Sequence, residues 1–162
     1  MGQEILVRVA DFRTATRSDV LVTLGLGSCV AIALWDPQAV VGGLAHVLLP
    51  SRSLSGRPSD TPAKFPQSAI PALLAEMTLL GADPRRLTAR LVGGASMFGN
   101  LSPPGSIQMG DRNLAATRDV LGGCGIPVVG EAVGGDFGRS VRFHVGNGRI
   151  EVHSVLHGEQ VL

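Results

Sequence analysis

The chain has 162 residues, which is enough for one ordinary domain. It is 44% hydrophobic and 17% charged, a composition that supports a packed core and excludes a disordered protein. The net charge is +1, no basic stripe is present, and there are five Phe, one Trp and no Tyr, so we expect no binding to nucleic acid. Two cysteines are too few for a disulfide scaffold.

No segment predicts export or membrane insertion. Residues 1–10 carry Glu4 and Arg8 within an alternating apolar pattern, which is typical of a strand and not of a signal peptide. The longest uncharged apolar stretch, residues 20–35, is shorter than the roughly 20 residues that a membrane-spanning helix needs. We therefore expect a cytoplasmic protein that does not insert into membranes.

The first part of the chain is predicted to be rich in strands. Alternating or β-branched apolar residues predict strands over 5–9, 20–24, 29–35 and 40–49. Residues 11–19 are polar and predict a loop. Four prolines and four serines in residues 50–66 predict a segment without regular structure.

The second part mixes helices with strands. A helix over 69–80 is predicted, with Ser68 as its cap and Pro71 in its first turn, and a second helix over 111–121. Strands are predicted over 87–92, 127–133, 140–145 and 149–156, and a loop over 101–110. Two helices and seven or eight strands without a repeat predict a single α+β domain over residues 1–162, with both helices packed on one sheet.

The first predicted hairpin brings a cysteine and a histidine together. If it turns at Pro37 and Gln38, Cys29 lies directly opposite His46, where a thiol and an imidazole can meet. This is the minimum pair of a nucleophile and a base, in which the histidine can hold the thiol as a reactive thiolate. A buried structural cysteine and a core histidine would give the same pattern.

The glycine-rich turn between these strands suggests two further roles. It could fold the hydroxyl of Thr23 towards the hairpin, where it would orient the imidazole of His46. The backbone near Gly27, with the N–H groups of Ser28 and Cys29, could stabilise an oxyanion.

A second predicted hairpin raises a metal hypothesis. With Asn147 and Gly148 as its turn, His144 faces Glu151 and Arg142 faces His153. A His–Glu–His set could hold zinc, but Arg142 opposes a cation and a polar solvent face explains the pattern equally well, so we predict no metal and no cofactor. Cys124 is interpreted as a structural residue at a helix end.

Several motifs in order resemble the CheD family of chemoreceptor glutamine deamidases. They are Thr23-Leu24-Gly25-Leu26-Gly27-Ser28-Cys29-Val30, Ala45-His46-Val47-Leu48-Leu49-Pro50, Gly93-Gly94-Ala95-Ser96-Met97-Phe98, Met109-Gly110-Asp111-Arg112-Asn113, Gly134-Gly135 and Gly138-Arg139-Ser140-Val141. The resemblance covers roughly residues 20–148, and its first two motifs together are specific.

This resemblance implies a three-layer α/β/β sandwich, similar to the catalytic domain of cytotoxic necrotizing factor, and catalysis by Cys29 as nucleophile, His46 as base and acid, and Thr23 as orienting residue. It implies that the substrates are glutamines on the cytoplasmic helices of methyl-accepting chemotaxis proteins. Some members also hydrolyse receptor methyl esters, and some are bound by the phosphatase CheC.

The chain departs from the family pattern at two positions. Phe65 and Gln67 stand where members usually carry Tyr and Asp, which bears on contacts to substrate or partner more than on the chemistry. Two other functions stay open at this point. One is an adaptor module that binds chemoreceptors or CheC with weak or no deamidase activity, and the other is a different cysteine hydrolase.

Overall fold

The computed structural model describes residues 2–55, 57, 60–97 and 108–162, and these form two five-stranded sheets. The first sheet contains, in spatial order, β1 (Glu4–Leu6), β3 (Val20–Leu26), β8 (Arg139–His144), β9 (Arg149–Ser154) and β10 (Gly158–Val161). The second contains β2 (Phe12–Thr16), β5 (Val41–Val47), β4 (Val30–Asp36), β6 (Thr88–Gly93) and β7 (Val128–Val133).

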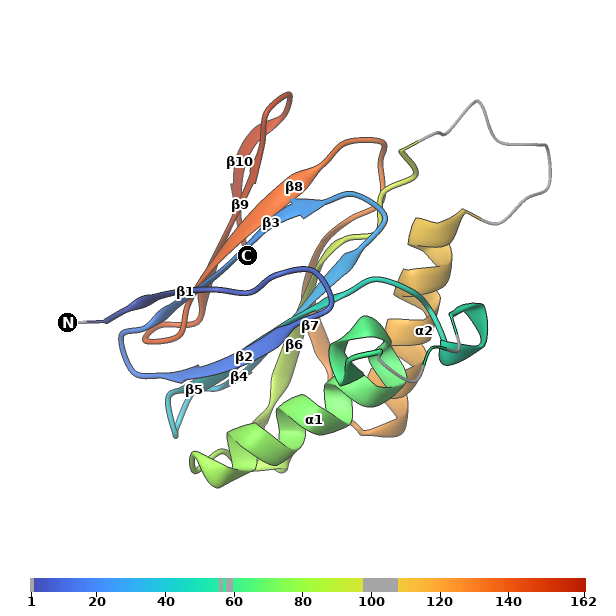
Figure 1. The fold of residues 1–162 in the computed structure, drawn as a ribbon. Helices are drawn as coiled ribbons and strands as arrows, with labels where there is room; N and C mark the ends of the chain where they lie inside the picture. Colours follow the sequence, from blue (N-terminus) through green and yellow to red (C-terminus); the bar gives the residue numbers. More distant parts are fainter. Residues whose placement is uncertain (1, 56, 58–59, 98–107) are drawn as a thin grey trace.

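Both helices cover one face of the second sheet. Helices α1 (Pro66–Leu79) and α2 (Met109–Gly123) lie on its outer side, and the first sheet packs on the other side (Figure 1). Two strand pairs, β1 with β3 and β6 with β7, are parallel, and the other pairs are antiparallel. The predicted α/β/β sandwich with a mostly antiparallel arrangement is confirmed.

Strand β4 shows how the sequence builds the two cores. Because side chains alternate along a strand, Val30, Ile32 and Leu34 pack towards the helices. Ala31 and Ala33 point the other way and pack between the two sheets. The central strand is therefore buried on both faces, which explains its nearly continuous apolar sequence.

Several predicted elements differ from the structure. The segment 11–19 contains strand β2, whose polar residues pair with β5 at the sheet edge, and the C-terminal strand β10 was not predicted. Two short 3₁₀ helices, Arg52–Leu54 and Pro62–Lys64, interrupt the segment expected to be irregular. The predicted loop 101–110 falls largely outside the described residues, and its last two residues belong to α2.

Helix α1 begins earlier than predicted. Its first residue is Pro66 and Phe65 is its N-cap, so Pro71 lies inside the helix and not in its first turn. Ser68 is not the cap, and its hydroxyl donates to the carbonyl oxygen of Pro62. The expected apolar face is buried at Ile70, Leu73 and Met77, whereas Leu80 follows the helix and is 46% exposed.

Both predicted hairpins have longer turns than expected. Asp36 pairs with Val41, so four residues and not two connect β4 to β5. His144 pairs with Arg149, so four residues also connect β8 to β9. A shift of two residues leaves every side chain on its predicted face, because the side-chain period of a strand is two, but it changes which residues lie opposite each other.

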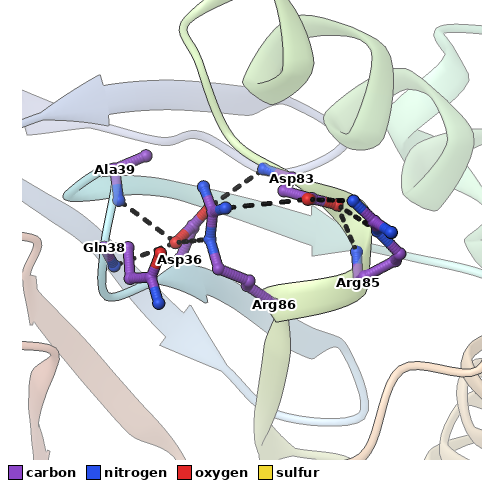
Figure 2. Close-up of polar contacts among 6 residues, drawn as sticks. All are labelled: Asp36, Gln38, Ala39, Asp83, Arg85 and Arg86. Carbon is purple, nitrogen blue, oxygen red and sulfur yellow. Dashed lines mark hydrogen bonds and ion pairs between the residues drawn. The ribbon is translucent and has the colours of Figure 1, made fainter.

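A buried carboxylate holds the β4–β5 turn (Figure 2). Asp36 has no exposed surface and accepts hydrogen bonds from the backbone N–H groups of Gln38, Ala39 and Asp83. The guanidinium of Arg86 completes the site, with Nη2 2.8 Å from Asp36 Oδ2. Burial raises the pKa of Asp36, but the Arg86 guanidinium and the three N–H groups outweigh it and lower that pKa to about 2.

The variant Asp36→Asn should lose about 2–3 kcal/mol of unfolding free energy at pH 7, because it removes the charged acceptor of the buried N–H groups and leaves Arg86 only its longer pair with Asp83, at 3.6 Å. Because the folded pKa of about 2 lies below the ordinary 3.8, this contribution is present above about pH 4 and is lost as the pH falls towards 2. Urea unfolding at pH 7 and pH 3 measures both effects. Glu4→Gln, which breaks the exposed pair with Arg142, is the control and should change stability little. Equal stability of Asp36→Asn and the parent at pH 7 would contradict this role of Asp36.

Candidate functional site

A hydrogen bond between the two sheets defines the site. Thr23 of β3, in the first sheet, places Oγ1 2.8 Å from Nδ1 of His46 on β5, in the second sheet. Neither residue exposes any surface. The predicted contact between Thr23 and His46 is therefore present, but it arises because the sheets face each other and not because the glycine-rich turn folds back.

The carbonyl of Val7 decides how this hydrogen bond is oriented. Thr23 Oγ1 also lies 2.6 Å from the Val7 carbonyl oxygen, which can only accept, so the hydroxyl proton is directed there. Thr23 must then accept from His46, which places the imidazole proton on Nδ1. The lone pair of the ring is left on Nε2, which is the tautomer that a general base needs.

Burial keeps the imidazole neutral. Nε2 of His46 is buried and has no hydrogen-bond partner among the described residues. Burial without a neighbouring carboxylate lowers the pKa of His46 to about 4. The backbone of His46 is held by its neighbours at the start of β2, since its N–H donates to Asp11 and its carbonyl accepts from Ala10.

Cys29 lies on the same face as His46 but not directly opposite it. In the observed register Ala31 is the partner of His46, so the predicted direct pairing with Cys29 is wrong by two residues. Cys29 packs in the inter-sheet core with Ala31, which makes it a diagonal neighbour of His46. Ala31, the strand partner of His46, carries only a methyl group.

The thiol is also neutral in the free protein. Cys29 is 8% exposed, and burial raises its pKa, which its own backbone N–H opposes only in part. With a thiol of raised pKa and an imidazole of lowered pKa, proton transfer between Cys29 and His46 is unfavourable near pH 7. The expectation that His46 holds Cys29 as a thiolate does not fit this environment.

The loop before Cys29 is anchored through its carbonyl groups. The carbonyls of Gly27 and Cys29 accept from the N–H groups of Ala95 and Gly94. The described chain uses neither the N–H of Ser28 nor that of Cys29 to bind another residue. Both stay candidates for oxyanion donors. Gly93 permits this packing, because at its φ of 108° a Cβ atom would overlap the Cys29 carbonyl.

Helix α2 supplies a site residue to which the sequence analysis gave no role. The side chain of Asn113 is fully buried, and its Nδ2 donates to the carbonyls of Ser28 at 2.9 Å and Leu48 at 3.1 Å. Asn113 belongs to the quoted motif 109–113. These contacts join residues 85 and 65 positions apart in the chain, so local sequence spacing cannot predict them.

The two departures from the family pattern lie away from these groups. Phe65 is buried as the N-cap of α1, with the guanidinium of Arg52 5.0 Å from the centre of its ring. Gln67 donates to the carbonyl of Pro50. Both stabilise the segment that follows β5 and make no hydrogen bond to Thr23, Cys29 or His46.

The histidine-rich face of β8 and β9 forms ion pairs. Arg142, not His144, is opposite Glu151 in the strand register, although the side chain of His144 still reaches Glu151 diagonally. Arg142 also pairs with Glu4 of β1. In the part of the chain that the structure describes, no three His, Cys, Asp or Glu side chains are placed to hold a metal ion.

Two remaining observations concern Cys124 and the helices. Cys124 is an exposed free cysteine at the C-cap of α2, the helix-end position that was predicted. Neither helix of the described residues has the length and apolar character needed to cross a membrane.

The chain belongs to the CheD family. The family model described as CheD chemotactic sensory transduction matches residues 48–154, about two thirds of the chain. This match includes Asn113 and begins after His46. The segment that contains Thr23, Cys29 and His46 is covered instead by relatives that align with the whole chain.

The relatives cover the N-terminal part as well. A protein of Desulfitobacterium hafniense (strain DSM 10664 / DCB-2), named probable chemoreceptor glutamine deamidase CheD, is 40% identical over 162 residues, all of both chains. Its namesake in Archaeoglobus fulgidus is 43% identical over 98% of each chain. Among solved structures, the hypothetical protein YfiH of Bacillus licheniformis is a distant likeness, with a TM-score of 0.45 and 17% identity over 76% of this chain and 49% of that chain.

Nuclear magnetic resonance of ¹⁵N-histidine-labelled protein should find His46 neutral, with its proton on Nδ1, from pH 7 to about pH 5, and protonated only near pH 4. Because this pKa lies below the ordinary 6.5, the unfolded chain takes up a proton first, and folding stability should fall as the pH drops from 6.5 to about 4. In Thr23→Val the acceptor for Nδ1–H is lost and the two tautomers should mix. An imidazolium signal of His46 at pH 7 would show that the site rests as an ion pair instead.

Proposed function

We propose that this protein deamidates glutamine side chains of methyl-accepting chemotaxis proteins, with Cys29 as nucleophile, His46 as general base and acid, and Thr23 as orienting residue. The observation that carries the proposal is the Thr23–His46 hydrogen bond of 2.8 Å, with Nε2 unengaged in the described chain and Cys29 on the same face. The printed names of the full-length relatives point to the same substrate class.

The reaction begins from two neutral groups. As the sulfur of Cys29 attacks the glutamine side-chain carbonyl, Nε2 of His46 accepts the thiol proton. The carbonyl oxygen becomes an oxyanion, for which the N–H groups of Ser28 and Cys29 are available donors. Such a donor contributes about 2.7–4 kcal/mol to transition-state stabilisation in well-studied hydrolases.

Because Thr23 is neutral, it suits the next step, in which His46 protonates the leaving nitrogen. Thr23 accepts from Nδ1–H without adding a negative charge, so nothing opposes the burial that lowers the pKa of His46, and the imidazolium formed during attack is a stronger acid than an exposed one. It protonates the leaving nitrogen, ammonia departs, and a thioester on Cys29 remains. His46 then takes a proton from water as the oxygen of that water attacks the thioester. It returns this proton to the departing sulfur, and the products are the free thiol and a glutamic acid that ionises to glutamate.

The substrate helices define where the protein acts. Receptor glutamines that face the cytoplasm require a cytoplasmic enzyme, and their conversion to glutamates adds negative charge to a helix surface, where like charges alter helix packing. Binding of the phosphatase CheC and hydrolysis of receptor methyl esters stay predictions from the family resemblance.

Cys29→Ala should abolish deamidation, since the thioester cannot form without the sulfur. A folded cytoplasmic fragment of a chemoreceptor from the same organism is incubated with each protein, and each glutamine that becomes glutamate is detected by peptide mass spectrometry as a gain of about 1 Da. Cys124→Ala, at an exposed helix end, is the matched control and should match the parent. A parent that binds the fragment but converts no glutamine would favour an adaptor module.

Thr23→Val keeps the shape of Thr23 and removes the acceptor for Nδ1–H. Since general acid–base catalysis contributes about 10²–10⁴-fold, loss of the correct tautomer should lower kcat by about 10–100-fold and leave KM nearly unchanged. Thr23→Ser retains the hydroxyl and should recover most of the activity. Equal kcat for Thr23→Val and the parent would remove Thr23 from the mechanism.

A further inference from the structure

The two chain segments that carry Cys29 and His46 extend beyond regular strand pairing. The ladder between β4 and β5 ends at the pair of Val30 and Val47. Cys29 lies just beyond this pair on one strand, and Leu48 just beyond it on the other. The distance between the segments at the site therefore depends on contacts other than the sheet ladder.

A single amide bridges the segments at this point. Nδ2 of Asn113 donates one hydrogen bond to the carbonyl of Ser28 and a second to the carbonyl of Leu48. Ser28 immediately precedes Cys29, and Leu48 follows His46 by two residues. The two donors of one rigid amide thus connect the backbone on both sides at a separation set by the amide itself.

Close backbone packing brings Asn113 to this place. Gly110, one turn earlier on α2, lies so near the carbonyl oxygens of Gly94 and Ala95 that any Cβ atom would overlap them. The N–H of Gly94 in turn donates to the carbonyl of Cys29 at 2.8 Å. Helix α2 and the loop after β6 therefore hold the residues around the thiol from two directions.

We propose that Asn113 is a positioning residue that sets the placement of Cys29 relative to His46 by tying the carbonyls of Ser28 and Leu48 together. This inference rests on the proposed function in taking Cys29 and His46 as the reacting pair. Asn113 contacts neither of them through a hydrogen bond and acts through the backbone. Its loss should reduce the rate of the chemical step, because a displacement of about 1 Å at a reacting group can cost about 100-fold.

Thr117 provides a matched control on the same helix. It lies one turn after Asn113, is also fully buried, and its Oγ1 has no hydrogen-bond partner among the described residues. Thr117→Val therefore changes a buried polar side chain on the same face of α2 without removing a bridge. It should leave kcat and KM within about twofold of the parent.

The test compares Asn113→Leu, which has a similar volume and no hydrogen-bonding group, with Thr117→Val and the parent. Deamidation of the receptor fragment is measured at 25 °C, below the melting temperature of each variant. We expect kcat of Asn113→Leu to fall by about 10–100-fold with KM within about twofold. A folded Asn113→Leu with kcat within twofold of the parent would overturn the proposal.

A second readout does not depend on the receptor reaction. Burial raises the pKa of the Cys29 thiol, so release of the loop in Asn113→Leu should speed alkylation of Cys29 by iodoacetamide and move the midpoint of its pH profile to lower pH. Thr117→Val should not change this profile. If the parent deamidates no receptor, the alkylation profile alone decides, and an unchanged profile overturns the positioning role.

Where Asn113→Leu does not fold, Asn113→Asp replaces it in both measurements. Its carboxylate would face two carbonyl oxygens, and only the protonated acid could donate one hydrogen bond. The proposal then requires the alkylation profile of Asn113→Asp to approach that of the parent as the pH falls. An alkylation profile equal to that of the parent at every pH would overturn it.

Discussion

The hydrogen bond between Thr23 and His46 depends on both sheets being packed at one fixed separation. One partner belongs to the first sheet and the other to the second, and both are fully buried. The Val7 carbonyl, where the chain leaves β1, fixes the direction of the hydroxyl proton. A change in the separation of the sheets would break this bond and leave the buried Nδ1–H of His46 without its acceptor, at a cost of about 1–3 kcal/mol, so the same contact connects stability with the state of the imidazole.

The environment of the site favours neutral groups until a substrate arrives. Burial raises the pKa of Cys29 and lowers that of His46, and no carboxylate offsets the loss of water. An uncharged hydroxyl orients the ring without making it more basic. In the proposed reaction the thiol of Cys29 would therefore transfer its proton as the new bond forms, and the resulting imidazolium would give up its proton readily. This balance suits a reaction in which ammonia must be protonated to leave.

Strand β4 is held by a buried polar group at each end. At its last residue, the carboxylate of Asp36 gathers three backbone N–H groups and Arg86. Just before its first residue, the amide of Asn113 gathers the carbonyls of Ser28 and Leu48. At one end the Asp36 carboxylate accepts from backbone N–H groups, and at the other the Asn113 amide donates to backbone carbonyls. Cys29, the proposed nucleophile, thus immediately precedes a strand whose position is defined at both ends.

Apolar periodicity in the sequence predicted a single α+β domain, most strands, both helices and the faces on which Cys29 and His46 lie, because it reports burial locally. The family resemblance added the α/β/β layering. Sequence patterns missed β2, since an edge strand can be polar, and they placed both hairpin turns two residues short. In the first turn Val40 takes a φ of 53°, which a β-branched residue rarely adopts and local propensity argues against. Alternation preserved the faces, so Cys29 and His46 share a side although they are not opposite. Only the tertiary structure decided that Thr23 reaches His46 from the facing sheet, that Val7 sets the tautomer, and that Asn113 bridges the two segments, because these contacts join residues 16 to 85 positions apart in the chain.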